Sequence, residues 1–540
     1  MDQAGKGRRG LWQFIEKYGA ICLVLVVVTG VCFLFASRKS GMFIDEIYTY
    51  GLSNSHYAPF LDDVKGGSLV DQTVSRQELL DYMMVNPGES FDFGSVYYNQ
   101  VNDVHPPLYY WLFNMASSLT PGVFSKWTGL ALDYALYMVA VVLLYLLSLR
   151  LFDSRWLAAA AAALYGLSVI GLSTMVMIRM YVLLTALSVL LAYLVALLIN
   201  RRRLWLCPLI GFVIFLGLMT QYYFVFYAFF LCGFFVLYAL FAKEFKLAGI
   251  FSLFAFGGVA LLLLVFPACL DHLFAEKLVS GGNALENLMN FSAYVSRLYF
   301  FVMEVLRRMK AAVYIAALSI LALALCFKKL LAAARERKIH FSALLLILPA
   351  FVAFVIEAII SPVVEIRYVY NLAPFFVLAV CFLLHMLERS LGEFKFAVPA
   401  KYAAALCILA LALWEARCLP PDYLYPEHND YNALLTQHAA APCVYMTDDY
   451  FPPVTQDLLM LMNFDEFFIT GDPASPALDE YLASFADATE CVVFIDVNAF
   501  WSSGFDAAEM LPELIEETPF TGFEPLYTYG LSETYLLTMG

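Results

Sequence analysis

Long apolar stretches recur along this chain of 540 residues, and they constrain its fold more than any other feature. Each is roughly 20 residues long, which matches the hydrocarbon thickness of a bilayer. Because a helix satisfies its backbone hydrogen bonds internally, we expect repeated membrane-spanning helices. Only 14% of the residues are charged, against about 25% in soluble globular proteins. Composition therefore excludes an ordinary soluble domain.

The basic residues orient the predicted helices. With the N-terminus in the cytoplasm, the clusters Arg150/Arg155 and Arg201–Arg203 fall in short cytoplasmic segments, as the positive-inside rule requires. The apolar segment 106–119 is short for a span, so we predict a helix lying on the outer surface. Counting it as a span would turn both clusters outward. We predict eleven spans, at 18–36, 127–149, 156–174, 180–199, 204–220, 222–242, 247–269, 310–327, 341–360, 368–387 and 401–418.

Composition also divides the chain into a membrane domain, residues 1–418, and an acidic domain, residues 419–540, which contains no Lys or Arg. The first outer loop of the membrane domain, residues 37–126, includes a predicted amphipathic helix over 68–85. In the acidic domain, apolar segments at 443–449 and 491–497 predict buried strands, and 526–538 predicts a hairpin. The fold class is thus an all-α multi-pass protein of the plasma membrane with a small extracytoplasmic α/β domain.

Cysteine usage says little about the compartment. Cys443 and Cys491 would be able to pair if the acidic domain faces an oxidising compartment. The odd total of 11 cysteines and the absence of metal-ligand spacing argue against a disulfide framework.

Acidic residues and a histidine stand out in the first outer loop. Asp45 and Glu46 follow the first span in the segment FIDEIYTYGL. Apolar surroundings should raise the proton affinity of at least one of them, as a general base near neutral pH requires. Asp103 and His105 precede an apolar helix in VNDVHPPLYY, where backbone N–H groups at a helix start attract an anionic phosphate. The structural alternatives are surface acids ending a helix, a helix-capping Asp103 and a solvated His105.

Lone charges lie near the ends of later spans. Arg179 and Arg367 occupy equivalent places at predicted outer boundaries, and arginine suits bidentate phosphate binding. The alternative for each is a snorkelling anchor. Glu357 lies within a span near Arg367 and would pair with it in a purely structural reading. Ionisable residues inside spans are functional candidates by default, so Asp133 joins them with lower weight.

Two aromatic residues and a second histidine complete the set. Tyr222 and Tyr223 lie at a predicted outer turn, where they would contact a sugar ring or a phosphate, or belong to an interfacial aromatic belt. His385 lies near the inner face and is interpreted as structural. Apart from His385, the unusual polar residues gather at one membrane face, whereas scattered anchors would decorate both.

The order of these motifs resembles the GT-C superfamily of integral membrane glycosyltransferases. The nearest branch is glycosyltransferase family 39, which contains protein O-mannosyltransferases and aminoarabinose transferases. The resemblance covers roughly residues 10–390 and leaves out the acidic domain. In the family's Thr-His-Tyr-Phe-like turn, Gln221 replaces the histidine. The matching segments are the acidic pair Asp45–Glu46, DVHPPLYY at 103–110, Arg179-Met180-Tyr181, Thr220-Gln221-Tyr222-Tyr223 and Arg367-Tyr368.

That resemblance implies transfer of a sugar, with inversion, from a polyprenyl-phosphate carrier to a hydroxyl or amine at the outer face. The acceptor would be a lipid, a protein or a wall polymer. Asp45 would be the general base, and Glu46 and Asp103 would orient the acceptor. Any divalent cation that serves as cofactor would be bound by Asp45, Glu46 and Asp103. The bilayer is the other expected partner, and no nucleic acid is expected. The residues implied to hold the carrier phosphate or its sugar are His105, Arg179, Tyr181, Tyr222, Arg367 and Tyr368.

Two other functions stay open from sequence alone. A transporter or flippase for polyprenyl lipids or polysaccharides should have broken helices, mid-membrane charges and often a pseudo-repeat. The sequence shows no repeat, and its ionisable groups lie near one face. A non-catalytic scaffold that presents the acidic domain to cell-wall partners is the second alternative, and it would leave Asp45 and Glu46 free to vary.

Overall fold

The computed structural model describes residues 2–274, 286–391, 398–448, 452–485, 487–498 and 504–539. The chain divides into two compact units. The membrane unit comprises Met1–Ser37, Val104–Tyr109 and Leu130–Asp422. The sheet unit comprises Arg38–Asp103, Tyr110–Gly129 and Tyr423–Gly540. The compositional boundary at 418/419 therefore leaves out a contribution from the first outer loop to the second unit.

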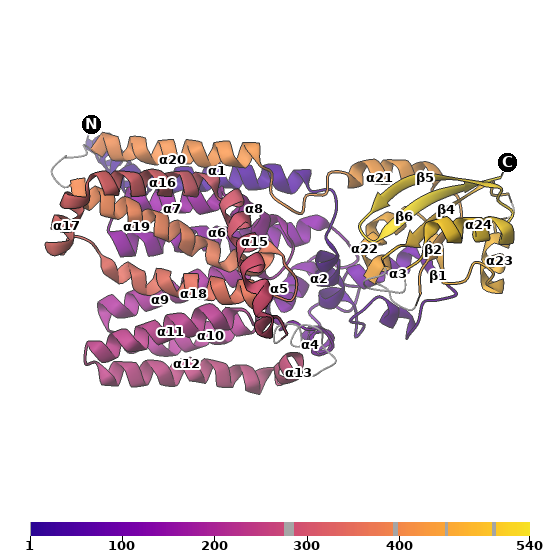
Figure 1. The fold of residues 1–540 in the computed structure, drawn as a ribbon, viewed down its shortest axis with the longest axis horizontal. Helices are drawn as coiled ribbons and strands as arrows, with labels where there is room; N and C mark the ends of the chain where they lie inside the picture. Colours follow the sequence, from indigo (N-terminus) through magenta and orange to yellow (C-terminus); the bar gives the residue numbers. More distant parts are fainter. Residues whose placement is uncertain are drawn as a thin grey trace. The chain divides into compact units, whose positions relative to one another are not determined.

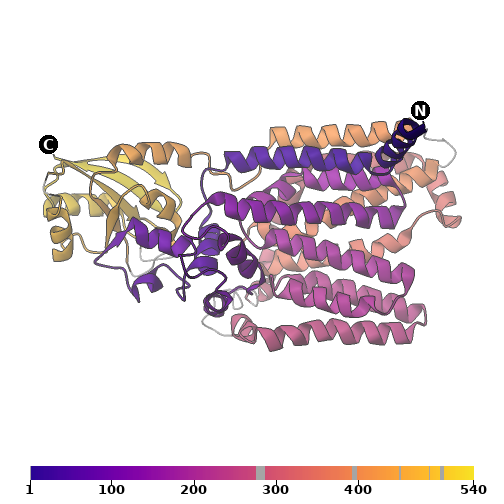
Figure 2. The ribbon, with the colours of Figure 1, turned by 180° about the vertical axis from the view of Figure 1, so that it is seen from behind.

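The membrane unit is a bundle of long helices that run side by side (Figures 1 and 2). Among the described residues, seven helices are long and apolar enough to cross a membrane, or nine if each of two bent pairs forms one span. A multi-pass membrane protein is thus confirmed, while the predicted count of eleven spans is not. Its helices are α1 (Asp2–Arg38), α6 (Lys126–Phe152), α7 (Arg155–Gly166), α8 (Val169–Val176), α9 (Tyr181–Arg201), α10 (Leu206–Leu218), α11 (Phe224–Phe241), α12 (Phe245–Val265), α13 (Cys269–Phe274), α15 (Tyr294–Arg308), α16 (Lys310–Leu325), α17 (Phe327–Arg335), α18 (Leu344–Ile360), η4 (Ile366–Leu372), α19 (Ala373–Leu391) and α20 (Val398–Cys418).

One predicted span is broken in the structure. Residues 156–174 form α7 and α8, which meet at 58°. The Ser168 hydroxyl accepts the Gly171 N–H at 3.1 Å and donates to the Tyr165 carbonyl at 2.8 Å. A serine that caps a new helix in this way ends one helix axis and starts another. The bend sets where α8 ends, directly before Arg179.

The sheet unit is a three-layer α/β structure. Its sheet has the order β1-β3-β2-β4-β6-β5, in which β2, β3 and β4 are parallel and the outer strands are antiparallel to their neighbours. Leu478 of α23 and Met510 of α24 belong to the core on one face. On the other face, Asp457 of α22 accepts the Tyr445 hydroxyl at 2.8 Å. The elements are β1 (Gln72–Ser75), β2 (Cys443–Met446), β3 (Glu466–Thr470), β4 (Glu490–Asp496), β5 (Gly522–Tyr529), β6 (Ser532–Thr538), α21 (His428–Leu435), α22 (Pro452–Leu461), α23 (Pro476–Ala483) and α24 (Ala507–Glu517).

The first outer loop supplies the edge strand of this sheet. The helix predicted over 68–85 is wrong at its start, because Gln72–Ser75 form β1 and pair antiparallel with β3. Only Arg76–Met83 is helical, as α3, and Ser75 caps it through hydrogen bonds with Glu78. Pairing with a strand nearly 400 residues away overrides the local helical pattern. The other helices of this loop are α2 (Ile44–Asn54), α4 (Phe93–Val101) and α5 (Leu108–Ser117).

The strands predicted in the acidic domain are confirmed. Residues 443–449 and 491–497 correspond to β2 and β4, residue 449 lying outside the described part, and 526–538 falls in the β5–β6 hairpin. Cys443 and Cys491 are buried free thiols on the neighbouring strands β2 and β4. Burial raises the pKa of both thiols, so neither is a ready nucleophile.

The β1 pairing predicts a matched pair of substitutions. Val74 is 2% exposed and Gln72 is exposed on the same strand. Val74→Asp would bury an unpaired charge and detach β1, which should speed hydrogen exchange of the β3 amides at least tenfold, or about 1.4 kcal/mol. Gln72→Asp should leave exchange unchanged. Equal exchange in both variants, measured on the full chain by mass spectrometry, would contradict the pairing.

Candidate functional site

The acidic pair lies in the first turn of α2, and its two members have different surroundings. Glu46 is fully buried, and its carboxylate accepts the Phe43 N–H at 2.7 Å and forms an ion pair with Lys39 at 2.9 Å. Lys39 Nζ also donates to the Tyr423 carbonyl at 2.6 Å. Asp45 is half-buried. Glu46 therefore holds the start of α2 in place, and Asp45 is the acid of the pair that solvent reaches.

Asp103 lies near α2 within the sheet unit. Burial raises the pKa of the Tyr82 hydroxyl, and the nearby Tyr48 and Asp103 raise it further. Tyr48 is three residues from Asp45 in α2, so the two share a helix face. Asp103 does not cap α5, which begins only at Leu108. Asp103 and Tyr48 of α2 are therefore both near enough to Tyr82 to influence its pKa.

A divalent cation does not fit the three acids as they lie. Within the described residues, no group of three or more His, Cys, Asp or Glu side chains has the arrangement of a metal site. Glu46, one of the three candidate ligands, already forms an ion pair with Lys39, which neutralises its charge. We therefore derive no step through a metal ion.

The motif DVHPPLYY is anchored within the membrane unit directly after its prolines. The Leu108 N–H donates to the Met219 carbonyl, just beyond α10, at 3.0 Å. The Tyr109 hydroxyl donates to Asp133 of α6 at 2.7 Å, and both side chains are fully buried. Asp133 thus has a structural partner, and the two contacts fix the position of His105.

His105 lines a polar pocket of about 200 Å³ in the membrane unit, together with Tyr222, Tyr368 and His272. We call this the polar pocket. The Tyr222 hydroxyl and His272 Nδ1 are 2.9 Å apart. Gln221 also lines the pocket, where its side-chain oxygen accepts the Tyr222 N–H at 2.7 Å. Three of the predicted carrier-binding residues therefore meet in one place, and the family's missing histidine position is used to shape the turn.

The two arginines lie on or next to contacting elements of the membrane unit, and neither is among the described residues that line the polar pocket. Arg367, in η4, is 6% exposed, forms an ion pair with Glu365 at 2.7 Å and lies over the Tyr368 ring at 5.6 Å. Arg179, 3% exposed, lies in the short break between α8 and α9. The rings of Tyr181 and Tyr370, which follow each arginine in α9 and η4, are 6.1 Å apart. Tyr181 therefore serves in the structure as the contact between these elements.

A charged brace holds α8 and η4. Arg308 of α15 donates to both carboxylate oxygens of Asp422, at 2.8 and 3.2 Å. The Asp422 N–H donates to Ser173 of α8 at 2.9 Å, and the Tyr370 hydroxyl of η4 donates to the same carboxylate at 3.5 Å. Bidentate pairs of this kind fix geometry as well as adding energy. The brace fixes the elements that carry both arginines.

Two remaining candidates, Glu357 and His385, are not among the described residues that line the polar pocket. The ion pair of Arg367 is with Glu365 rather than with Glu357, because Glu365 is two residues away on the same segment. Glu357 is fully buried, and neither of its carboxyl oxygens has a hydrogen-bond partner among the described residues. His385 is buried against His340, their ring centroids 5.0 Å apart.

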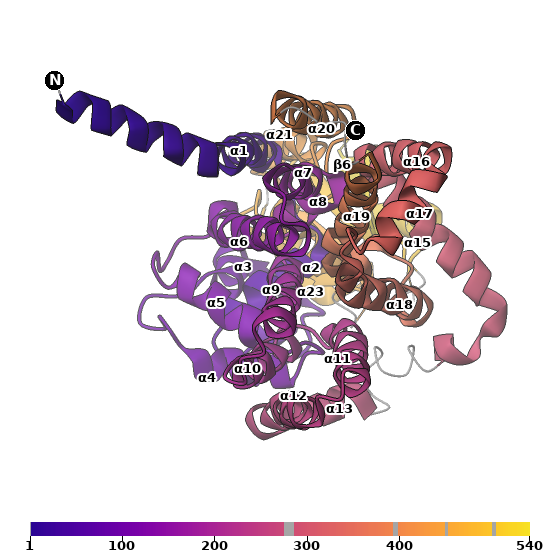
Figure 3. The same ribbon diagram turned by 90° about the vertical axis from the view of Figure 1, so that its left-hand side faces the viewer.

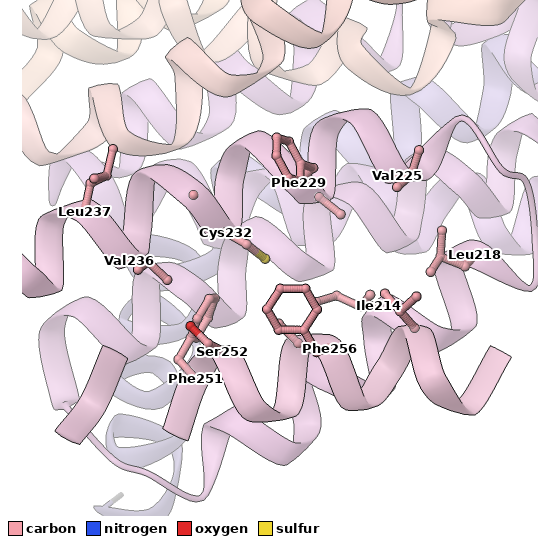
Figure 4. A pocket seen from close by; sticks show the side chains of 14 residues that line it. Ile214, Leu218, Val225, Phe229, Cys232, Val236, Leu237, Phe251, Ser252 and Phe256 are labelled. Atoms are coloured by element: carbon pink, nitrogen blue, oxygen red, sulfur yellow. The ribbon is translucent and has the colours of Figure 1, made fainter. Parts of the chain in front are cut away.

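An apolar groove of about 400 Å³ adjoins the polar pocket. It lies between α10, α11 and α12, which are neighbours in the end-on view of Figure 3. Figure 4 shows Cys232 of α11 pointing toward Phe256 of α12. Gly211 and Gly258 allow α10 and α12 to approach closely, since a Cβ at either would meet the other helix's backbone within 2.3 Å. Val225 lines both the groove and the polar pocket.

Sequence reasoning missed two residues of these sites. His272 follows the end of α12, and histidines are rare here, with 7 in the chain. A histidine directly after a span was a usable signal. Lys39 resembles any basic residue flanking a first span, and only its burial beside Glu46 distinguishes it.

Residues 104–270 match the family model described as dolichyl-phosphate-mannose-protein mannosyltransferase. No curated protein matches the chain in sequence. Among solved structures, ArnT from Cupriavidus metallidurans bound to undecaprenyl phosphate is 12% identical, with 96% of this chain and 98% of that chain covered and a TM-score of 0.47. The Archaeoglobus fulgidus oligosaccharyltransferase tethered with an acceptor peptide is 12% identical, with 95% and 73% covered and a TM-score of 0.45. Likeness at this level transfers no residue role or ligand. The family match covers His105, Arg179 and Tyr222, so it supports the resemblance over the motifs that contain these residues.

The buried Lys39–Glu46 pair predicts a non-additive effect on stability. Lys39→Met leaves an uncompensated buried carboxylate and should destabilise the sheet unit by about 3–5 kcal/mol. Adding Glu46→Gln removes that charge and should recover most of the loss. Thermal unfolding of the purified single and double variants measures both. A double variant no more stable than Lys39→Met would contradict the pairing.

Proposed function

We propose that this chain, which is a membrane glycosyltransferase of the GT-C superfamily, moves a sugar from a polyprenyl-phosphate carrier to an extracytoplasmic acceptor with inversion, using Asp45 as general base. One observation carries the proposal more than any other. A polar pocket containing His105, Tyr222 and His272 shares the lining residue Val225 with an apolar groove, and two of the helices around that groove, α11 and α12, are long enough to span the bilayer. That combination suits an amphipathic ligand with an anionic head.

The polar pocket supports a role in phosphate binding. His105 and Tyr222 are hydrogen-bond donors, and the guanidinium of Arg367 lies over the ring of Tyr368, which lines the pocket. Arginine remains charged when buried and forms paired hydrogen bonds with phosphate oxygens. In this proposal Arg179 and Arg367 meet the phosphate charge, while Tyr222, oriented by His272, donates to it.

The apolar groove supports a role in holding the carrier tail. Its lining is almost entirely hydrophobic, with Ser252 as the one hydroxyl-bearing side chain. Phe229 and Phe256 at its sides are 68% and 75% exposed, so an isoprenoid chain would lie against aromatic surface.

The role of general base is assigned to Asp45 because its neighbour Glu46 already forms an ion pair with Lys39. Glu46 is fully buried and ion-paired, so it is unavailable to an acceptor. Asp103 belongs to the same unit as Asp45, and it lies near Tyr82 together with Tyr48 of α2.

The proposed step balances as a single displacement. Asp45 takes the proton of the acceptor O–H or N–H as that atom attacks the anomeric carbon. The bond between the anomeric carbon and the phosphate oxygen breaks, and the carrier leaves as a polyprenyl phosphate with one more negative charge. Preorganised donors stabilise charge that develops in this way, which is the role given to Arg179, Arg367 and Tyr222.

Substitution of the base separates binding from turnover. Asp45→Asn removes the proton acceptor while keeping size and polarity, so transfer should fall at least about 100-fold. Binding of the carrier to protein in nanodiscs should be unchanged. The substrates are a panel of polyprenyl-phosphate sugars, and the assay measures the release of sugar from each carrier.

Glu46→Gln provides the comparison, with Lys39→Met added to keep the site uncharged. That variant should retain transfer if Glu46 only supports α2. The α7–α8 bend is a feature that a transporter would share, and a transporter needs no base. Turnover of Asp45→Asn equal to that of the wild type would therefore reject Asp45 as the base.

Filling the groove tests the tail site. Gly233 lines it, and a Cβ there would meet no atom within 4 Å. Gly233→Leu should therefore fold normally, occupy the groove and weaken carrier binding at least tenfold. Gly257, on α12, also has open space at its Cβ but does not line the groove. Gly257→Leu should bind the carrier like the wild type, and equal affinities in the two variants would contradict the tail site.

A further inference from the structure

A separate pocket of about 660 Å³ lies in the sheet unit, between α24 and the β5–β6 hairpin. Figure 1 shows α24 beside β4 and β6. The Phe505 N–H donates to the Asp496 carbonyl at the end of β4 at 2.7 Å. Asp506 caps α24 by accepting the Ala508 N–H at 2.9 Å. These contacts fix the segment that forms one side of the pocket. We call this pocket the α24 pocket.

Three aromatic rings line the α24 pocket. Phe505 comes from the segment before α24, Phe523 from β5 and Tyr535 from β6. Phe523 and Tyr535 are diagonal neighbours across the hairpin, with centroids 6.1 Å apart and planes at 80°. Phe523 is 47% exposed, so its ring is presented to the pocket and to solvent. Phe505 and Tyr535 are partly buried and pack against the core, which fixes their positions. Aromatic side chains at a pocket are typical of sites that bind the apolar faces of ligands.

Two carboxylates accompany the rings. Asp506 is exposed, and Glu533 accepts the Tyr535 hydroxyl at 2.6 Å, which fixes its orientation. The residues that line the pocket include no Lys or Arg, and residues 419–540 contain none at all. Such a pocket repels anions and offers acceptors to hydroxyl or ammonium groups.

We propose that the α24 pocket is a saccharide-binding site, which takes a neutral or amine-bearing sugar. A pyranose presents an apolar C–H face, which packs on aromatic rings, and a rim of hydroxyl donors, which carboxylates accept. The α24 pocket offers both on adjacent walls: Phe523 and Tyr535 for the ring face, and Asp506 and Glu533 for the hydroxyls. The site would retain a sugar-bearing acceptor, and this role rests on the proposed function. Binding of the saccharide itself does not require sugar transfer.

The test measures binding to the full chain in nanodiscs without any carrier, so its outcome is independent of turnover. The probes are chitotetraose and cellotetraose, which are neutral, the fully deacetylated chitosan tetramer, which is cationic, tetragalacturonate, which is anionic, and spermine, a cation without rings. Calorimetry should show binding of a neutral or aminated tetrasaccharide and none of tetragalacturonate. Phe523→Ala and Glu533→Gln should each weaken that binding at least tenfold.

Glu524 provides the matched control, because it is exposed on β5 beside Phe523 but does not line the pocket. Glu524→Gln should bind like the wild type, and so should Asp45→Asn, which separates this site from the catalytic one. The proposal is overturned if no tetrasaccharide binds, if tetragalacturonate binds as well as the neutral sugars, or if spermine binds while neutral sugars do not. Unchanged binding by both pocket variants would also overturn it.

Discussion

A charge within bilayer hydrocarbon costs several kcal/mol unless it is paired or reaches water, and the arrangement of polar groups in this chain follows from that constraint. In the membrane unit, the functional candidates lie where helices end or break: Arg179 between α8 and α9, Tyr222 between α10 and α11, and Arg367 in η4. A substrate whose tail cannot leave the bilayer would present its phosphate at the same depth. The location of the site is thus dictated by the solvent as much as by the chemistry.

The same constraint explains why many of the buried polar side chains hold helices in place. Asp133 accepts the hydroxyl of Tyr109, Asp422 joins α8, α15 and η4, and Glu46 is neutralised by Lys39. Each of these acids has at least one partner within the protein. Among the acids of the first outer loop, Asp45 differs because it lies beside a buried, paired carboxylate and is itself partly accessible. Support by neighbours of this kind is what holds a reacting group in place.

The sequence predicted the parts of the fold that depend on local pattern. Apolar length located the helices, and apolar runs located β2, β4 and the terminal hairpin. Long-range strand pairing was not predictable from the sequence. Nothing within residues 68–85 indicates that Gln72–Ser75 would join a sheet formed by residues beyond 440. The helix break at Ser168 also depends on a cap that an unbroken apolar run conceals. For the site, the motifs led to His105, Tyr222 and Arg367, whereas Lys39 and His272 acquire their roles only through contacts.

The central claim is that the acid on α2 and the arginines of the membrane unit act on one carrier molecule. A cryo-electron microscopy structure of the full chain in nanodiscs with a bound polyprenyl phosphate tests it most directly. The account predicts the phosphate between Arg179 and Arg367 and the Asp45 carboxylate about 7–10 Å from it, on the order of the spacing that leaves room for an attacking group. A carrier bound there with Asp45 turned toward bulk solvent, far from the phosphate, would contradict the account.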